Sequence, residues 1–260
     1  MNYLLDQYAR VKRALARGEN LRDALAIKWY VQELMAEQIC RHLRPGSSVL
    51  EVGCGGSLTL HLLDSRGHHT TGVDVDPRFV EYSNVLGVAL GSDTEILQAD
   101  AFDLPFSANS FDYVYSVGML EHYKVPEQQT IVDEMCRVSR RYVHLEIPNL
   151  HPLSTFYTIG LRSEEVHLPC NPGLLLSQLG CSVVEIDGRC IFNTLEELKE
   201  NPPLLAFARV HAPPDLLKET YAAGDVARLC EAERRVSNAE RLVYGFQVGW
   251  IAQLPGASDT

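Results

Sequence analysis

The sequence predicts an α/β fold built on a doubly wound, mostly parallel sheet. Short apolar runs alternate with segments of helical spacing from residue 47 to about residue 186, and this alternation is typical of βαβ units. The first apolar run, Val49–Val52, leads into the glycine-rich turn Gly53–Ser57, and a helical pattern begins directly afterwards at Leu58. A strand, a tight turn and a helix in that order indicate a βα turn that can approach a ligand closely.

The predicted strands and their helices follow one another along the chain. Asp76 and Pro77 form an N-cap and first-turn pair that begins a helix after the second strand, and Asn171 with Pro172 begins a later helix in the same way. Pro148 ends the fifth strand. Apolar, β-branched and aromatic runs predict strands at residues 49–52, 70–75, 95–99, 111–116, 142–147 and 182–186.

Helical segments precede this core. Apolar residues at helical spacing predict a first N-terminal helix and a second one over residues 20–43, with Asn20 as its cap. These helices have two possible roles. They either cover a face of the sheet or form a lid over a substrate, with Tyr8, Trp29 and Tyr30 as candidate aromatic walls.

Composition and charge exclude several classes of protein. A chain of 260 residues that is 46% hydrophobic can bury a full core. Its formal net charge of −11 repels a phosphate backbone, so nucleic acid is not an expected partner. No run of 18 apolar residues occurs, so we expect no membrane span, and the charged N-terminus does not resemble a signal peptide.

The seven cysteines are scattered along the chain and odd in number, and none forms a Cys-x-x-Cys pair. This pattern indicates neither a zinc site nor a disulfide framework. Reduced thiols fit a cytoplasmic location, which is the expected localisation.

Acidic residues follow the predicted strands at their carboxyl ends, the edge at which such sheets bind ligands. Asp74 ends the second strand about 20 residues after Gly55, a spacing at which an acid can reach ribose hydroxyls. Asp100 follows the third strand, and Ser116–His122 follows the fourth. Each has a structural alternative: Asp74 or Asp76 as a helix cap, Asp100 as a turn acid, and the end of the last segment as a solvated helix end.

The type of ligand follows from the turn and these acids. Leu58 stands where a dinucleotide-binding turn would have its third glycine. Acids at Glu51, Asp74 and Asp100 suit a cationic ligand that carries ribose and adenine better than they suit a pyrophosphate. S-adenosylmethionine is such a ligand.

Four segments resemble successive motifs of the class I S-adenosylmethionine-dependent methyltransferases of the small-molecule type, in the family's order and spacing. The resemblance covers about residues 47–186 and implies a seven-stranded Rossmann-like sheet whose last strand is antiparallel, for which Tyr244–Leu254 is the candidate. Ser57 departs from the pattern, because the family commonly has glycine there. The four segments are Val49–Ser57, Gly72–Pro77, Ala99–Phe106 and Phe111–His122.

The chain is therefore expected to divide into four parts. The segment between the sixth strand and the last one has a helical pattern that Pro202-Pro203 and Pro213-Pro214 interrupt. The expected parts are an N-terminal helical lid or cap (1–45), a Rossmann-like cofactor-binding core (46–190), a helical insertion (191–240), and the last strand with a tail (241–260).

The resemblance also implies the cofactor and its contacts. S-adenosyl-L-methionine would bind, and S-adenosyl-L-homocysteine would be released. The glycine turn would line the methionine end, and the end of the second strand would bind the ribose. The residues that follow the second and third strands would contact the adenine, and the end of the fourth strand would pass beneath the sulfonium. In that order the residues are Glu51, Gly53, Cys54 and Gly55, then Asp74, then Val75, Asp100 and Ala101, and finally Ser116 and Val117.

The implied reaction transfers the methyl group to an oxygen, nitrogen or carbon nucleophile of a small metabolite. Some nucleophiles must first lose a proton. His122, His151 and His167 are the candidate catalytic residues for this step, because an unperturbed imidazole titrates near neutral pH. A structural role is the alternative for each histidine.

Two other functions stay open at this point. The chain could have the methyltransferase fold and bind the cofactor while it performs non-methylating chemistry or acts as a binding partner, or it could methylate a protein. We predict no metal, because Asn149 is the one obvious ligand after the fourth and fifth strands. The expected partner is a small-molecule acceptor, with neither nucleic acid nor membrane. The oligomeric state is open, with a homodimer among the options.

Overall fold

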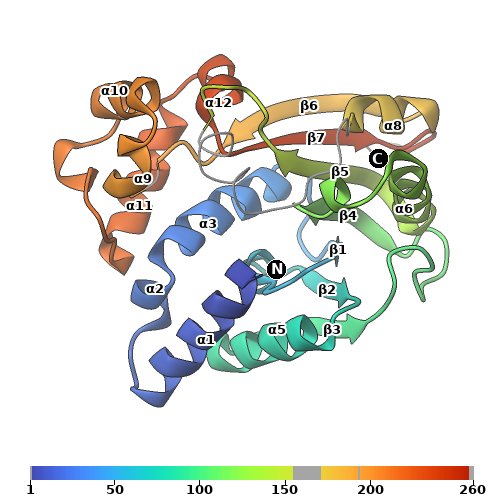
Figure 1. The fold of residues 1–260 in the computed structure, drawn as a ribbon. Helices are drawn as coiled ribbons and strands as arrows, with labels where there is room; N and C mark the ends of the chain where they lie inside the picture. The colour runs from blue at the N-terminus through green and yellow to red at the C-terminus, as the bar shows by residue number, and fades with distance from the viewer. Residues whose placement is uncertain (1, 155–170, 193, 258–260) are drawn as a thin grey trace. The chain divides into compact units, whose positions relative to one another are not determined.

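The computed structural model describes residues 2–154, 171–192 and 194–257, and a seven-stranded sheet runs through them (Figure 1). Its spatial order is β3-β2-β1-β4-β5-β7-β6. Strands β1 to β5 pair in parallel, and Figure 1 shows β7 running opposite to its neighbours β5 and β6. The doubly wound, mostly parallel sheet is therefore confirmed. The strands are β1 (Ser48–Val52), β2 (His69–Asp74), β3 (Glu95–Gln98), β4 (Phe111–Val117), β5 (Ser139–Pro148), β6 (Ser182–Arg189) and β7 (Gln247–Gln253).

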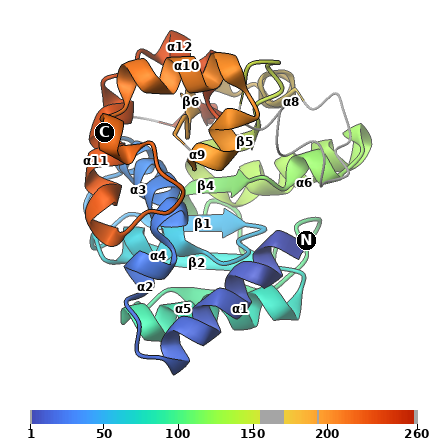
Figure 2. The ribbon, with the colours of Figure 1, turned by 60° about the vertical axis from the view of Figure 1, so that its left-hand side comes forward.

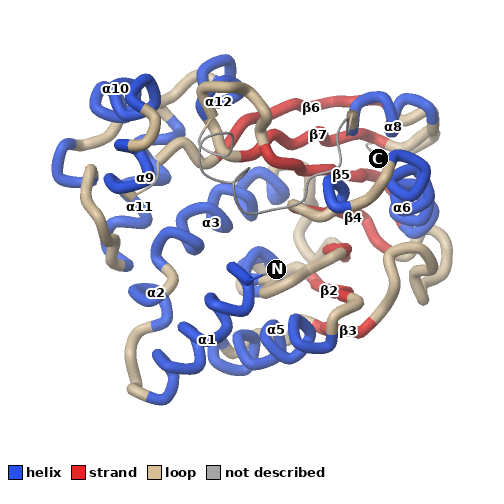
Figure 3. Tube along the Cα trace, viewed as in Figure 1, coloured by secondary structure: helices blue, strands red, loops and turns tan. Residues whose placement is uncertain are grey.

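Helices connect the strands and make up most of the segment between β6 and β7 (Figure 3). The helical insertion predicted there is present as four helices with a short 3-10 turn, η3 (Pro214–Leu216). The described helices are α1 (Asn2–Ala16), α2 (Leu21–Ala24), α3 (Ala26–Cys40), α4 (Leu58–Asp64), α5 (Pro77–Leu90), α6 (Val125–Val138), α8 (Pro172–Gln178), α9 (Leu195–Lys199), α10 (Pro202–His211), α11 (Ala223–Arg234) and α12 (Asn238–Tyr244).

Three helix starts follow the predicted caps. Asn20, Asp76 and Asn171 each accept a backbone N–H of the first turn of α2, α5 and α8. The single helix predicted over residues 20–43 is wrong, because α2 and α3 are separate. Leu25, at φ −118°, leaves helical geometry between them, and its N–H still bonds to Leu21. None of the described helices is long and apolar enough to cross a membrane.

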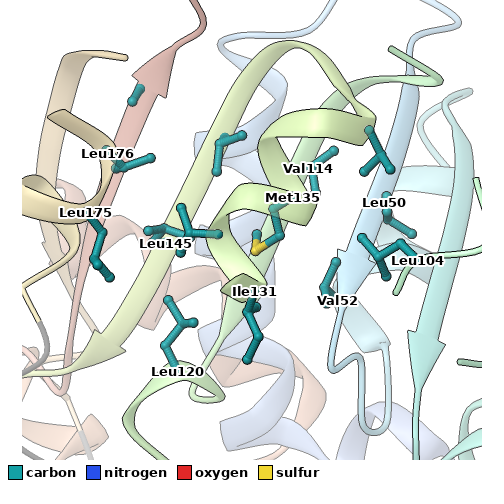
Figure 4. Close-up of a cluster of buried hydrophobic side chains, with 14 of the residues drawn as sticks. Leu50, Val52, Leu104, Val114, Leu120, Ile131, Met135, Leu145, Leu175 and Leu176 are labelled. Atoms are coloured by element: carbon teal, nitrogen blue, oxygen red, sulfur yellow. The ribbon is translucent and has the colours of Figure 1, made fainter. Parts of the chain in front are cut away.

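Helices cover both faces of the sheet around β1, β2 and β4. On one face, α6 packs on fully buried side chains such as Leu50 and Val114 (Figure 4). Burying one such aliphatic side chain contributes about 1.5–3 kcal/mol. On the other face α4 approaches β2 so closely that a Cβ on Gly72 would lie 2.8 Å from Leu60. Figure 2 shows α4 and α5 beside β2 from a second direction.

The described residues form two compact units, each assembled from segments distant in sequence. One unit contains residues 2–35, 148–154, 187–192 and 194–248. The other contains residues 36–147, 171–186 and 249–257 and carries the core of the sheet. The four-part division made from the sequence stays a prediction.

A partly buried ion cluster joins the end of α3 to β6. The Glu185 carboxylate accepts hydrogen bonds from Gln38 at 2.8 Å and Arg41 at 2.6 Å, and it lies 2.9 Å from His42 Nε2. Burial alone would raise the pKa of Glu185. The hydrogen bonds from His42 and Gln38 and the charge of Arg41 outweigh burial and lower this pKa to about 2.

Replacing Glu185 with glutamine should lower the free energy of unfolding at pH 7 by about 2–3 kcal/mol. Since the folded pKa of about 2 lies below the unfolded value of 4.5, this stability is present above pH 4.5 and is lost as the pH falls toward 2. Urea unfolding at several pH values should show the gap between wild type and variant narrowing in that window. A difference in unfolding free energy that does not change with pH would contradict this role of the Glu185 carboxylate. Asp215→Asn, which breaks an exposed ion pair with Arg228, is the control and should change little.

A second buried carboxyl lies in the other unit. Glu233, on α11, accepts the backbone N–H groups of Cys190 at 2.7 Å and Ile191 at 3.1 Å, and the Tyr30 hydroxyl donates to it. Burial raises the pKa of Glu233 to about 7, against the opposing effects of these N–H groups and of Arg241. The carboxyl therefore takes up a proton on folding at mildly acidic pH.

We expect the stability that Glu233 contributes to be full below pH 4.5 and to be lost as the pH rises through about 7, because its folded pKa exceeds the unfolded one. In Glu233→Gln, the slope of the unfolding free energy between pH 4.5 and 7 should be less negative than in wild type. The contribution of Glu233 thus falls with rising pH between 4.5 and 7, whereas the contribution of Glu185 rises with pH between about 2 and 4.5. Parallel pH profiles for wild type and variant would disprove the assignment.

Candidate active site

The glycine turn after β1 is held against the end of β2. The backbone N–H groups of Gly53 and Cys54 both donate to the carbonyl of Val73, at 2.9 Å each. Gly53 has φ 71°, and a Cβ there would lie 2.5 Å from the sulfur of Met119. Ser57 has φ 47°, a left-handed conformation that glycine adopts more easily. This explains why the resembling family commonly has glycine at that position.

Asp74, at the end of β2, receives two backbone N–H groups. Its Oδ2 accepts from Gly55 and its Oδ1 from Asp76, both at 2.9 Å. The expectation that one of these two acids caps the helix is confirmed for Asp76, which caps α5. Burial raises the pKa of Asp74, and its hydrogen bonds with Asp76 and Gly55 oppose that rise. A carboxylate can accept about four hydrogen bonds, so roughly two acceptor positions remain for ligand hydroxyls.

The end of β3 lies beside Asp74, because the N–H of Ala99 donates to the Asp74 carbonyl at 3.1 Å. Asp100 is exposed, and one carboxylate oxygen accepts the N–H of Phe102 at 3.0 Å. Ala101 is half-buried, and Val75 is 58% exposed. An apolar side chain exposed to that extent at this edge is suited to covering the flat face of a ligand ring.

The segment after β4 comes next along the same edge. Ser116 is fully buried, and its Oγ has no hydrogen-bond partner among the residues that the structure describes. Val117 is half-buried, and Gly118 donates its N–H to the carbonyl of Glu146 at 3.0 Å. His122 is exposed in a 3-10 turn, η1 (Leu120–His122). The glycine turn and this segment are in contact through Met119, so the structure brings these sequence-predicted residues to one edge.

Sequence reasoning missed a buried polar row on the sheet face that carries Glu51. The Tyr115 hydroxyl donates to the Glu51 carboxylate at 2.9 Å. Tyr113 Oη lies 3.0 Å from His144 Nδ1, and His144 Nε2 lies 3.5 Å from a Glu146 carboxylate oxygen. Burial, followed by the charge of Glu51, raises the pKa of Tyr115 well above its usual value, so the hydroxyl stays protonated and donates. The signal in the sequence is polar residues at period two in β4 and β5.

Of the other two histidine candidates, the structure describes His151. It belongs to the unit that contains residues 148–154, where it is exposed and its Nδ1 accepts the N–H of Leu153 at 3.2 Å. Asn149, the one metal ligand considered, donates through its amide to the carbonyls of Leu242 and Gly245. His167 lies outside the described residues. Within the described ranges no group of three or more histidine, cysteine, aspartate or glutamate side chains is placed to hold a metal.

These residues fit S-adenosylmethionine. Asp74 offers oxygen acceptors to a pair of hydroxyls, and the buried carboxylate of Glu51 lies one strand away, paired in register with Gly72 of β2. Two acids partly withdrawn from water favour a positively charged ligand, since their attraction to it is weakly screened. The glycine turn has no side chain at Gly53 to prevent close approach.

Residues 50–145 match the family model described as a methyltransferase domain. The ubiquinone biosynthesis O-methyltransferase of Hahella chejuensis is 31% identical over 97 residues, which are 37% of this chain and 40% of that protein. The chain thus spans less than half the length of this curated relative.

Two solved structures share the fold. Magnesium protoporphyrin IX methyltransferase from Synechocystis PCC 6803, with bound SAH, has a TM-score of 0.55 at 13% identity, covering 89% of this chain and 84% of that one. The cyclase SpnF has a TM-score of 0.55 at 16% identity, covering 85% and 80%. The methyltransferase-domain match over residues 50–145 and the seven-stranded sheet together support a class I S-adenosylmethionine-dependent methyltransferase fold for this part of the chain.

Proposed function

We propose that this chain transfers the methyl group of S-adenosylmethionine to an oxygen, nitrogen or carbon nucleophile of a small metabolite. The observation that carries the proposal is the Asp74 carboxylate. It is held by the N–H groups of Gly55 and Asp76 and still has acceptor capacity at the ligand-binding edge of the sheet. The name of the Hahella chejuensis relative, a ubiquinone biosynthesis O-methyltransferase, supports a small-molecule acceptor.

The cofactor, when bound, supplies an activated methyl group on a sulfonium. The work of the protein is to bind, orient and exclude water. Asp74 would hold the ribose hydroxyls, and Val75, Asp100 and Ala101 would contact the adenine. Glu51, whose carboxylate Tyr115 orients, would attract the cationic methionine end.

Ser116 has a place in this arrangement. Its buried Oγ has no partner within the described residues, and it lies at the carboxyl end of β4. Together with Val117 it would contact the cofactor near the sulfonium. His122 is the last residue of η1, on the segment that follows β4, and it is the proposed proton acceptor on this edge. His151 and His167 are proposed on the acceptor side.

One observation favours a second function. SpnF has the same fold, and its name, a [4+2]-cyclase, describes a reaction other than methyl transfer. A chain that binds the cofactor and performs non-methylating chemistry is therefore the alternative. It would share the cofactor site and differ in the fate of the methyl group.

Isothermal titration calorimetry with S-adenosylmethionine and, separately, S-adenosylhomocysteine tests the proposal. Micromolar binding of both is the expected result. If neither binds, the enzyme assignment fails while the fold remains. A screen of small metabolites with mass detection then separates the two functions: an acceptor gains a methyl group in a methyltransferase, whereas S-adenosylmethionine stays unconsumed in the alternative.

A further inference from the structure

Two cysteine sulfurs meet where α6 approaches the beginning of β6. Cys136 lies near the C-terminal end of α6, and Cys181 directly precedes β6. Their Sγ atoms are 4.0 Å apart, although the residues are 45 positions apart in the sequence. Both belong to the unit that carries the core of the sheet. This distance is a van der Waals contact between two thiols, and neither sulfur is in a disulfide.

The two cysteines pack among apolar side chains but are not fully shielded from solvent. Cys181 is 7% exposed and belongs to the cluster of buried side chains shared by α6 and α8. Cys136 is half-buried and packs against the same cluster. An oxidant as small as water can therefore reach this position, whereas a peptide-sized disulfide has little access.

The two thiols have different acidities. The contact between the two sulfurs, 4.0 Å apart, lowers the pKa of the Cys181 thiol and raises the pKa of the Cys136 thiol, and burial adds to the rise at Cys136. Cys181 is thus the more acidic of the two, and the thiolate is the form of a cysteine that reacts with oxidants. A neighbouring thiol that can attack an oxidised sulfur is the arrangement of a redox-sensitive pair.

We propose that Cys136 and Cys181 are a modification site at which hydrogen peroxide forms a reversible disulfide. The Cys181 thiolate attacks the peroxide: an S–O bond forms, the O–O bond breaks, and sulfur loses two electrons as the peroxide is reduced to hydroxide. The hydroxide takes a proton to become water. Cys136 sulfur then attacks the sulfenic sulfur, so that the S–S bond forms, the S–O bond breaks, and the departing hydroxyl leaves as water with the Cys136 proton. A dithiol reductant reverses the change.

The bond would restrain the helix that supports the cofactor edge. On α6, Glu134 accepts the N–H of Leu104 and Arg137 donates to the carbonyl of Phe106, in the loop that follows Asp100. Gln128 donates to the carbonyls of Leu120 and Tyr123, after β4. Joining α6 to the start of β6 removes unfolded-state freedom, so the oxidised protein should melt several degrees higher. The inference is independent of the reaction that the enzyme catalyses.

The test treats the full-length protein with a modest excess of hydrogen peroxide, blocks the remaining thiols, and maps disulfides by mass spectrometry without reduction. We expect the loss of two hydrogens from the intact protein, a peptide pair joined through Cys136 and Cys181, and reversal by dithiothreitol. Cys136→Ser should prevent the cross-link and leave a trappable sulfenic acid on Cys181. In Cys181→Ser the reactive sulfur is missing, so peroxide should oxidise the remaining Cys136 more slowly than it oxidises Cys181 in the wild type.

The matched control uses a buried thiol outside the pair. Cys190→Ser should leave the cross-link and its rate unchanged, because Cys190 is fully buried and burial raises the pKa of its thiol to about 12. Three results would overturn the inference: sulfinic acid at either residue without a cross-link, a disulfide that joins Cys136 or Cys181 to a different cysteine, or equal melting temperatures for the oxidised and reduced forms. Because the mapping is done on the wild-type chain, a variant that folds poorly does not prevent a decision.

Discussion

Replacing Asp74 with alanine is expected to weaken S-adenosylmethionine binding by at least about tenfold. A hydrogen bond to a charged group is worth about 1.5–3 kcal/mol, and 1.4 kcal/mol corresponds to a tenfold change in affinity. The substitution also removes the acceptor for the N–H groups of Gly55 and Asp76, so the glycine turn loses one of its bonds to β2 and keeps those of Gly53 and Cys54 to the Val73 carbonyl. Both effects act in the same direction. Calorimetric titration of wild type and variant measures the loss.

Asp76→Ala is the matched control for this experiment. Its side chain caps α5 through the N–H of Arg78 at 2.9 Å and forms an ion pair with that arginine, but it accepts nothing from the glycine turn. We expect a loss of stability of about 1 kcal/mol, typical of an N-cap, with unchanged affinity. If Asp74→Ala binds as tightly as wild type, the cofactor does not use Asp74. If the two variants lose affinity equally, the effect comes from α5 and not from the carboxylate.

The order of strands and helices could be predicted because it depends on local patterns. Apolar runs and caps place β1 to β4, α4 and α5 within a few residues of their observed positions. Boundaries were less accurate where two elements meet without a loop. Ser139 is both the C-cap of α6 and the first residue of β5, so this strand, predicted from residue 142, begins three residues earlier.

Individual residues of the site could be predicted from the sequence, but the contacts between distant residues could not. Asp74 and the glycine turn were found from their spacing along the chain. The bond between the Gly55 N–H and the Asp74 carboxylate was not, since it depends on how the turn lies against β2. The hydrogen bond from Tyr115 to Glu51 joins residues 64 positions apart, and it exists because β1 and β4 pair with these two residues opposite each other. A register between distant strands cannot be read from either strand alone.

Replacing Gly53 with alanine should both destabilise the protein and weaken cofactor binding. The left-handed φ of 71° costs a non-glycine residue about 1–2 kcal/mol. The new Cβ would lie 2.5 Å from Met119 Sδ and 3.0 Å from its Cγ. Such overpacking typically costs a further 1–3 kcal/mol, so the two costs together are roughly 2–5 kcal/mol. Because Met119 lies on the segment after β4, relief of the contact moves that segment relative to the turn. Urea unfolding and calorimetric titration measure the two effects.

Gly46→Ala separates backbone strain from the steric contact. Gly46 has φ 74°, almost the value at Gly53, but a Cβ there would meet nothing within 4 Å. Gly46→Ala should therefore be destabilised by the backbone cost alone and should bind the cofactor as tightly as the wild type. The Gly53→Ala penalty should also shrink in a Met119→Ala background, because the side chain that it strikes has been removed, and the size of that coupling measures the contact directly. Equal losses in Gly46→Ala and Gly53→Ala would mean that strain alone acts. The glycine at position 53 would then be required by the turn's conformation and not by its approach to the segment after β4.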